Sequence, residues 1–432
     1  MDQLRFTKLA ATLMLAITFV LSGLLVRAAG TGDVSAFVRW GSLGQEYGLV
    51  QGYKVMVDRW PETVLGGNWS AGGGEYPPLG FAWLYLLSNL ADAIFGGPHY
   101  AAFKIAVLAF SFISTGMIWL LSGSVALAAA YQAATILSAP GLGYMDVVPA
   151  PFLIGALWAI RKDRPVPGFV LFLLSILLKW QSLIIAPFLL LHMLEISDLR
   201  SIGRAFVKPV TWQLGAAFLI TVLCVGAVFG ASPLRAFHWG LLHPYLSGNA
   251  LNIPWVATFV VRLLFSPDFA IGKELPLITW PQPYLLPFRL IFFALFILIV
   301  LRFVRVERTF TNCLLFSVLG VVTYGVWNSA VHENHWFVAL VPAFILVVEA
   351  KDCPARWISI LVAVMLNVNL FVFYGIAGQE VVSRAVGIDL SVILALIYGA
   401  IWLLLLSYAW SIRPVTAPLL FPMKRRAARA EL

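Results

Sequence analysis

Long apolar runs recur along the whole of this chain, beginning with the run from Leu9 to Ala28. A membrane-spanning helix needs roughly 20 apolar residues, so this first run is long enough to cross a bilayer. Of the 432 residues, 61% are hydrophobic and 11% are charged, whereas a soluble globular domain carries about 25% charged residues. The pattern predicts an all-α polytopic membrane protein whose constant partner is the lipid bilayer. Because further runs follow, the first one is interpreted as an anchor rather than a cleaved signal peptide.

The net charge of +9 indicates membrane topology rather than a nucleic-acid partner. Lysine and arginine gather beside the ends of the apolar runs, and by the positive-inside rule such clusters and both termini are cytoplasmic. The three cysteines show no metal-binding or redox spacing and are interpreted as small apolar residues. The basic clusters are Arg5/Lys8, Arg161–Arg164, Arg200/Arg204/Lys208, Arg302/Arg305/Arg308, Lys351/Arg356 and Lys424–Arg426, and the cysteines are Cys224, Cys313 and Cys353.

Alternation of these runs predicts about twelve transmembrane helices in one integral membrane domain, residues 1–432. Residues 121–160 contain two apolar runs split by Pro140-Gly141-Leu142-Gly143, and they are assigned one net crossing through a broken or re-entrant pair. This keeps Arg161–Arg164 inside and buries Asp146 at depth, where an ionisable group suggests function. The other crossings are expected at 9–28, 79–96, 100–120, 168–178, 182–194, 210–230, 284–301, 312–331, 336–350, 357–376 and 387–410, and a turn at Gly96-Gly97-Pro98 joins the second to the third, at the cytoplasmic face.

Two polar segments are predicted to lie outside the membrane on the extracytoplasmic face, residues 30–77 and 231–283. The first is a large loop with several acids, which are Asp33, Glu46, Asp58, Glu62 and Glu75. The second holds His238 and His243, interpreted as interfacial residues, and Asp268, Lys273 and Glu274, with an apolar middle (253–265) that lies along the membrane surface. Acids retained beside a membrane point to chemistry in the first loop.

Topology brings further polar groups to this same face, at Lys179–Gln181 and at His332–His335. A carboxylate such as Asp33 or Glu75 can act as the general base for a hydroxyl. Lysine, arginine and protonated histidine can neutralise a departing phosphate. These residue types therefore favour a reaction between an anionic lipid headgroup and a nucleophile.

Four short motifs, in order along the chain, resemble those of the GT-C glycosyltransferases. The segment Gly32 to Trp40 resembles the first-loop motif, and Glu75-Tyr76-Pro77-Pro78-Leu79 is similar to the acidic-Tyr-Pro-Pro-Leu motif that opens the second span. Lys179-Trp180-Gln181 with Pro187 and Val331-His332-Glu333-Asn334 resemble a lysine–glutamine and a His-Glu-Lys motif, with asparagine at position 334. Within this superfamily the motifs most resemble those of dolichyl-phosphate-glucose-dependent glucosyltransferases, and related mannosyltransferases share the acid in the first loop.

The resemblance implies a GT-C-type membrane fold and an inverting transfer of a hexose. The donor is then a polyprenyl- or dolichyl-phosphate sugar, and the acceptor is a hydroxyl of a lipid-linked glycan or another molecule, at the outer face of a membrane, by preference a prokaryotic plasma membrane. No cofactor is expected and no metal ligand is assigned, although Asp33 with Glu75 leaves a divalent metal open. The implied catalytic acids are Asp33 and Glu75. The candidate substrate-binding residues are Arg39, Tyr76, Lys179, Gln181, His332, Glu333 and His335, together with Asp146, which is included because of its predicted depth in the membrane.

Two alternatives remain open, a multi-span secondary transporter and a flippase for lipid-linked sugars. Buried Asp146 and Lys179 suit a transporter, whereas the absence of a visible inverted repeat argues against one. Individual residues also have structural interpretations. Asp33 can cap a helix, Glu75 can pair with Arg39 or Arg59, and Lys179 can reach the interface from below.

Overall fold

The computed structural model describes residues 2–97, 100–196, 198–266, 279–350, 353–376, 384–385 and 388–415. These residues are almost entirely helical, in agreement with the predicted all-α class. The α-helices are α1 (Asp2–Leu25), α2 (Gly32–Tyr47), α3 (Leu49–Asp58), α4 (Pro78–Phe95), α5 (Tyr100–Ser122), α6 (Val125–Thr135), α7 (Ala150–Arg161), α8 (Pro165–Leu178), α9 (Ala186–Met193), α10 (Leu199–Phe206), α11 (Pro209–Phe229), α12 (Ser232–Leu241), α13 (Ile253–Phe265), α14 (Gln282–Arg305), α15 (Phe310–Trp327), α16 (Phe337–Ala350), α17 (Cys353–Tyr374) and α18 (Leu390–Ser411).

Short turns and strands connect these helices. The π-helical turns are η1 (Pro61–Leu65) and η3 (Leu137–Gly141), and the 3-10 turns are η2 (Trp69–Ala71), η4 (Met145–Val147), η5 (Trp180–Ile185) and η6 (Glu333–Trp336). The strands are β1 (Ser247–Gly248), β2 (Val331–His332), β3 (Arg384–Ala385) and β4 (Ile388–Asp389). Asp268, Lys273 and Glu274 of the second outer segment, and the basic cluster Lys424–Arg426, lie outside the described residues.

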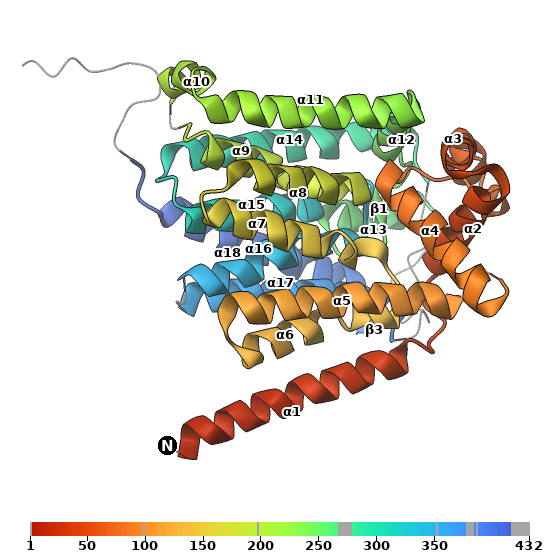
Figure 1. Ribbon diagram of the computed structural model, residues 1–432, viewed down its shortest axis with the longest axis horizontal. Coiled ribbons are helices and arrows are strands. Elements are labelled where there is room, and N and C mark those ends of the chain that lie inside the picture. The colour runs from red at the N-terminus through yellow and green to blue at the C-terminus, as the bar shows by residue number, and fades with distance from the viewer. Residues whose placement is uncertain are drawn as a thin grey trace, which may run out of the picture.

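Most of the helices run side by side as one bundle, and α1 lies obliquely along its edge (Figure 1). Eight of the described helices are long and apolar enough to cross a membrane, and five further apolar helices are shorter. Helices α2, α3 and α4 gather at one end of the bundle, beside α12 and β1 (Figure 1). We call this the site end, and the end that carries Arg161 the opposite end. The molecule is therefore a helical protein suited to a membrane, with its polar segments collected at one end.

Local sequence explains where several helices begin. Proline occupies the first turn of α4, α11, α13 and α14, where the missing N–H costs no hydrogen bond. Side chains of Ser124, Asn252 and Thr309 cap α6, α13 and α15 by accepting backbone N–H groups, as expected of these residue types. These signals fix where helices begin at both ends of the bundle, and α4 and α14 are among those that begin at the site end.

The break predicted within residues 121–160 is present, but the single net crossing is not, because α6 and α7 both run along α5 and the segment goes to the site end and back (Figure 1). Helix α6 passes into the π-turn η3, which contains Pro140, and the chain continues through η4 before α7 begins. A proline inside a helix removes a backbone hydrogen bond and clashes with the preceding turn, so a regular helix cannot continue there. Asp146 in η4 is 1% exposed, which places an acid deep inside the protein as predicted.

Basic residues gather at the opposite end, as the charge pattern predicts. Arg161 ends α7 and forms an ion pair of 2.5 Å with Glu349, which lies at the end of α16 remote from η6. Helix α14 begins beside Leu242 at the site end and finishes with Arg302 and Arg305 in its last turn. The segments 30–77 and 332–335 therefore share one end, and Arg161 lies at the other.

The path of α4 differs from the sequence prediction. Lys104, near the start of α5, donates hydrogen bonds to the carbonyls of Leu25 and Ala28 at the end of α1 and to that of Gly141. The start of α5 therefore lies at the site end, and only a short connection separates it from Phe95, the last residue of α4. The turn expected at the opposite end is thus at the site end, where α4 packs along α2 (Figure 1).

A candidate active site built from six segments

The first outer segment, expected as a loop, is folded into α2, α3, η1 and η2, and α2 presents Asp33. Thr31 is the N-cap of α2, and its N–H donates to the carbonyl of Leu142, so the start of α2 is fixed beside the broken segment. Asp33 lies in the first turn and is half-buried. Among the residues that the structure describes, none forms a hydrogen bond or ion pair with its carboxylate, so Asp33 is a free acceptor in the cluster.

Burial raises the pKa of Asp33 to about 6. The positive charge of Lys179 opposes this rise, and the negative charges of Asp146 and Glu75 add to it. Desolvation disfavours the charged form of an acid, and neighbouring like charges do the same. A carboxyl group with this pKa is mostly ionised at neutral pH and is a stronger base than an ordinary aspartate.

Glu75 is held from three directions. Its carboxylate oxygens lie 3.0 Å from His243 Nε2 and 2.9 Å from Trp60 Nε1, and its backbone carbonyl accepts a hydrogen bond from Trp180 Nε1. Burial alone raises the pKa of Glu75, but the interactions with His243 and Trp60 outweigh it and hold the pKa below its ordinary value. Glu75 is therefore fixed as a structural anion, and both of its oxygens are occupied.

Lys179 and Asp146 form a buried ion pair at the centre of the site. The distance from Lys179 Nζ to Asp146 Oδ2 is 2.7 Å, and the side chains are 3% and 0% exposed. The ammonium group also lies 5.4 Å from the centre of the Tyr76 ring. Lys179 follows the last residue of α8 and adopts an extended backbone, which turns its side chain into the bundle. The pair joins α8 to the broken segment between α6 and α7.

His332 and Glu333 come from the turn that connects α15 to α16. Strand β2 pairs in parallel with β1, and Gly248 lies opposite His332. The His332 ring lies 5.2 Å from that of His243, and Tyr144 donates a hydrogen bond to Glu333 Oε1. Burial, followed by the charge of His243, lowers the pKa of His332 well below its ordinary value. His332 is therefore neutral at neutral pH and can donate a hydrogen bond but not a full positive charge.

His335 serves to hold two turns together. Its Nε2 lies 2.9 Å from Gln181 Nε2, and its Nδ1 lies 3.1 Å from the hydroxyl of Tyr324. These contacts join η5, which follows Lys179, to η6, which follows His332. Both ring nitrogens are engaged, so His335 positions its neighbours, whereas Gln181 Oε1 has no hydrogen-bond partner among the described residues.

Arg39 is the one sequence-predicted site residue that lies apart from the cluster. Its guanidinium is exposed and donates to the carbonyl of Ser70, and its stem packs against Gly72. It therefore supports the turn at the end of the first outer segment. Nine predicted residues are brought together, which are Asp33, Glu75, Tyr76, Asp146, Lys179, Gln181, His332, Glu333 and His335.

Sequence reasoning missed several residues of the site. His243 was expected to be an interfacial residue, but it is 8% exposed and lies against Glu75. Its neighbours in sequence, Pro244 and Tyr245, gave only a weak signal of a turn. Trp60 and Tyr144 also reach site carboxylates, and no motif marks either of them.

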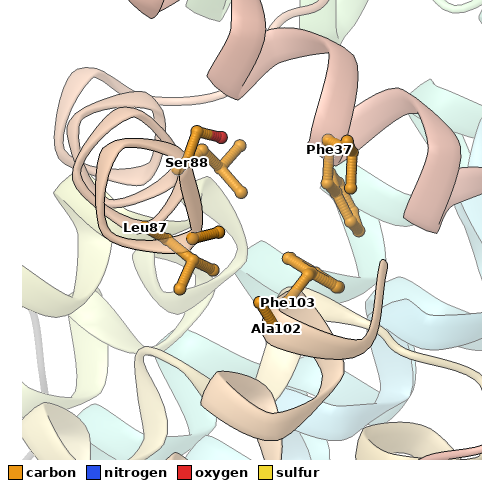
Figure 2. Close-up of a pocket in the computed structure, with 8 residues that line it drawn as sticks. Phe37, Leu87, Ser88, Ala102 and Phe103 are labelled. Atoms are coloured by element: carbon orange, nitrogen blue, oxygen red, sulfur yellow. The ribbon is translucent and has the colours of Figure 1, made fainter. Parts of the chain in front are cut away.

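Figure 2 shows a separate narrow crevice between α2, α4 and α5. Its lining is apolar apart from one serine hydroxyl, and consists of Phe37, Val38, Leu84, Leu87, Ser88, Ala91, Ala102 and Phe103. No titratable group lines it, so the chemistry of the site belongs to the charged cluster and not to this crevice.

The cluster combines a free acid, a fixed acid, a buried ion pair and neutral histidines. In the described part of the chain, no group of three or more His, Cys, Asp or Glu side chains is arranged to hold a metal ion. No family model matches the sequence, and no curated protein matches it either.

Proposed function

We propose that the chain is an inverting glycosyltransferase that moves a hexose from a polyprenyl-phosphate donor to an acceptor hydroxyl. The observation that carries this proposal is the contrast between the two acids. Asp33 is unpartnered among the described residues and its pKa is about 6, whereas both oxygens of Glu75 are occupied. A base that is ionised at neutral pH and still strong is the group that activation of a hydroxyl requires.

Asp33 accepts the proton of the acceptor hydroxyl while the acceptor oxygen attacks the anomeric carbon of the sugar. The bond between this carbon and the phosphate oxygen breaks, and its electron pair leaves with the polyprenyl phosphate. Attack and departure on opposite sides of the carbon invert its configuration. Glu75 keeps the entry to α4 and the second outer segment in place through Trp60 and His243.

Lys179 is the cation for the departing phosphate. Asp146 is its partner within the protein, at 2.7 Å. A buried lysine whose partner is removed is strongly destabilised, so the carboxylate of Asp146 stabilises Lys179 until the donor phosphate takes its place. Neutral His332 supplies a hydrogen bond to the same phosphate.

The finer architecture belongs to this proposal. A GT-C-type fold with about twelve crossings places the site end at the extracytoplasmic face of a membrane, by preference a prokaryotic plasma membrane. The basic residues at the opposite end support this orientation, and the site end suits a donor whose headgroup lies at the membrane surface.

Replacement of Asp33 by asparagine tests the proposal directly. Purified protein is incubated with polyprenyl-phosphate mannose or glucose and an acceptor glycan, and the release of polyprenyl phosphate is measured. We expect Asp33→Asn to bind donor normally and to turn over about 10²–10⁴-fold more slowly, which is the usual contribution of a positioned base. Asp92→Asn, which changes an exposed acid on α4, is the matched control and keeps full activity.

Two outcomes contradict this assignment. If Glu75→Gln is inactive while Asp33→Asn retains turnover, Glu75 is the base. If wild-type protein moves labelled lipid-linked sugar across vesicle membranes and releases no polyprenyl phosphate, the protein is a transporter or flippase. The buried pair of Asp146 and Lys179 is the observation that favours this second function.

A further inference from the structure

A second group of polar side chains borders Asp33, on elements that the proposed reaction does not use. It consists of Tyr144, Asn249, Glu333 and Tyr374, and we call it the tyrosine–amide cluster. Asp33 is close enough to Tyr144, Glu333 and Tyr374 for its charge to act on all three. The four residues come from the segment before η4, the segment after β1, η6 and the end of α17. Their convergence beside the proposed base gives them a place in the same site.

The parallel pairing of β1 and β2 aligns two of these residues. Because Gly248 lies opposite His332, the next residues, Asn249 and Glu333, leave the ladder side by side. Asn249 has a φ of 58°, a left-handed conformation that asparagine tolerates better than most residues. The backbone of Glu333 is held by Asn369, whose amide nitrogen lies 3.0 Å from its carbonyl oxygen. The positions of both side chains are therefore fixed by the backbone.

Hydrogen bonds within the cluster leave polar capacity for a ligand. The hydroxyl of Tyr144 donates to one oxygen of Glu333, and the amide of Asn249 donates to the hydroxyl of Tyr374 at 3.0 Å. The Tyr374 hydroxyl also interacts with that of Tyr144, so the remaining capacity lies on the Asn249 amide, which keeps a second N–H donor and an oxygen acceptor. Tyr144 and Glu333 are buried, whereas Asn249 and Tyr374 are half-buried. The accessible edge of the cluster thus offers both donors and acceptors.

The chemistry of these groups selects a neutral ligand rich in hydroxyl groups. The cluster contains no cation that would attract a phosphate. A carboxyl group, two phenols and an amide together accept and donate at several points, as vicinal hydroxyls require. The edges of the two tyrosine rings, whose centres are 6.4 Å apart, add apolar surface for the C–H faces of a sugar.

We infer that the tyrosine–amide cluster is a subsite that binds the hydroxyl groups of a sugar beside Asp33. This inference rests on the proposed glycosyl transfer and adds the residues that select the sugar. The hydroxyls belong either to the hexose of the donor or to the acceptor glycan, and the experiment separates these two sources.

Binding of two lipids to the full-length protein tests the subsite. Affinities for polyprenyl-phosphate mannose and for bare polyprenyl phosphate are measured without acceptor, and the KM for the acceptor glycan is measured separately. The variants are Tyr374→Phe and Asn249→Ala. Tyr398→Phe is the matched control, because it also removes a tyrosine hydroxyl, one that bonds to a carbonyl of α17 and lies outside the tyrosine–amide cluster. Glu333→Gln is a further variant that keeps the shape of the side chain.

If the subsite holds the donor sugar, we expect Tyr374→Phe and Asn249→Ala to lower the affinity for the sugar-bearing lipid by roughly 10-fold. The affinity for the bare lipid should fall by less than about twofold. If it holds the acceptor, both lipid affinities stay the same and the acceptor KM rises by roughly 10-fold. Glu333→Gln follows the same pattern, because it exchanges the carboxyl group for an amide with a different set of donors and acceptors.

Equal losses for both lipids, or no change in either lipid affinity or in the acceptor KM, overturn the inference. A loss of the same size in Tyr398→Phe also overturns it, since the effect is then a general consequence of losing a buried hydroxyl. Wild-type protein that binds neither lipid and releases no polyprenyl phosphate refutes the glycosyltransferase itself, and the sugar subsite falls with it.

Discussion

Asp33 and Glu75 show how the same functional group acquires different properties at one end of a helical bundle. Glu75 accepts from Trp60 and lies against His243, and these interactions hold its pKa below the ordinary value despite burial. Burial of Asp33 without a partner among the described residues raises its pKa to about 6. Environments that push two carboxyl groups apart in acidity commonly separate their roles. The free acid is suited to proton transfer and the fixed acid to holding the site together.

The raised pKa of Asp33 predicts the pH dependence of turnover. A base works in its ionised form, so kcat/KM should be constant above about pH 7 and fall as the pH drops through about 6. Stability changes in the opposite sense, because the folded state binds the proton more tightly than the unfolded state. This contribution favours the folded state at low pH and is lost as the pH rises from about 4 to about 6.

Initial rates measured from pH 4.5 to pH 8.5 in a mixed buffer check this prediction. The acidic limb should have its midpoint near pH 6 and should be missing from the residual activity of Asp33→Asn. A midpoint near pH 4, as for an ordinary exposed aspartate, contradicts the role of Asp33 as the buried base.

Sequence reasoning identified the acids but not all of their partners. Asp33 and Glu75 stand beside glycine or proline in recognisable motifs, whereas Asn249 and Tyr374 stand in segments with no motif. Their relation to Asp33 exists only after distant segments meet, and no local pattern of apolar residues encodes such a meeting. His243 was misjudged for the same reason, since its partner Glu75 is far away in the sequence.

At the scale of elements, the short β1–β2 pair decides how the residues around His332 are placed. Strands β1 and β2 contain two residues each, yet their register sets His332 beside Gly248 and Glu333 beside Asn249. The two strands approach so closely that a side chain on Gly248 has no room. A Cβ atom there would lie 2.6 Å from His332 Nδ1. A glycine is therefore required by the His332 ring itself.

We expect Gly248→Ala to displace the His332 ring and to lower turnover by roughly 10-fold or more, since small misplacements in an active site are costly. The donor affinity should fall as well, because His332 donates to the phosphate in the proposed site. Gly215→Ala on α11 is the matched control, as no atom lies within 4 Å of the added Cβ. Thermal unfolding in detergent shows whether the variant is still stably folded, and activity assays then measure its turnover and donor affinity. A variant with wild-type turnover and affinity means that the His332 position is unimportant.

The element predictions succeeded where apolar length and helix-stop signals decide the outcome. The break at Pro140 and the buried Asp146 followed from the sequence, since Pro140 lacks the N–H that a continuing helix needs and two glycines follow it closely. The path of α4 could not be predicted, because its 18 residues are apolar enough for a membrane crossing and equally suit packing along α2. Hydropathy measures length and composition, and it contains no information about which surface covers a helix.

For the whole molecule, the two ends of the bundle have different chemistry. Arg161, Arg302 and Arg305 lie at the opposite end, and the acids of the first outer segment lie at the site end. The positive-inside rule predicts that the opposite end faces the cytoplasm. The structure adds that the connection after α4 lies at the site end, together with the proposed active site.

Labelling of single cysteines checks this arrangement. In a variant without native cysteines, Glu46→Cys, Asp92→Cys and His238→Cys should react with a membrane-impermeant reagent from outside intact cells. Asp163→Cys should react only after the membrane is opened. All four positions are exposed, so their access reports topology rather than burial. If positions 46 and 238 are labelled from outside but position 92 is not, α4 crosses the membrane, as hydropathy alone predicts.

The distribution of the site along the chain has a consequence during synthesis. Asp33 emerges from the ribosome early, whereas Glu333 and Tyr374 follow only after most helices have entered the membrane. Until then the early acid has neither the late turn nor the end of α17 beside it. A nascent or truncated chain therefore cannot bring these side chains together. Under the proposed function, turnover would begin only when insertion is nearly complete, which would make turnover a reporter of correct biogenesis.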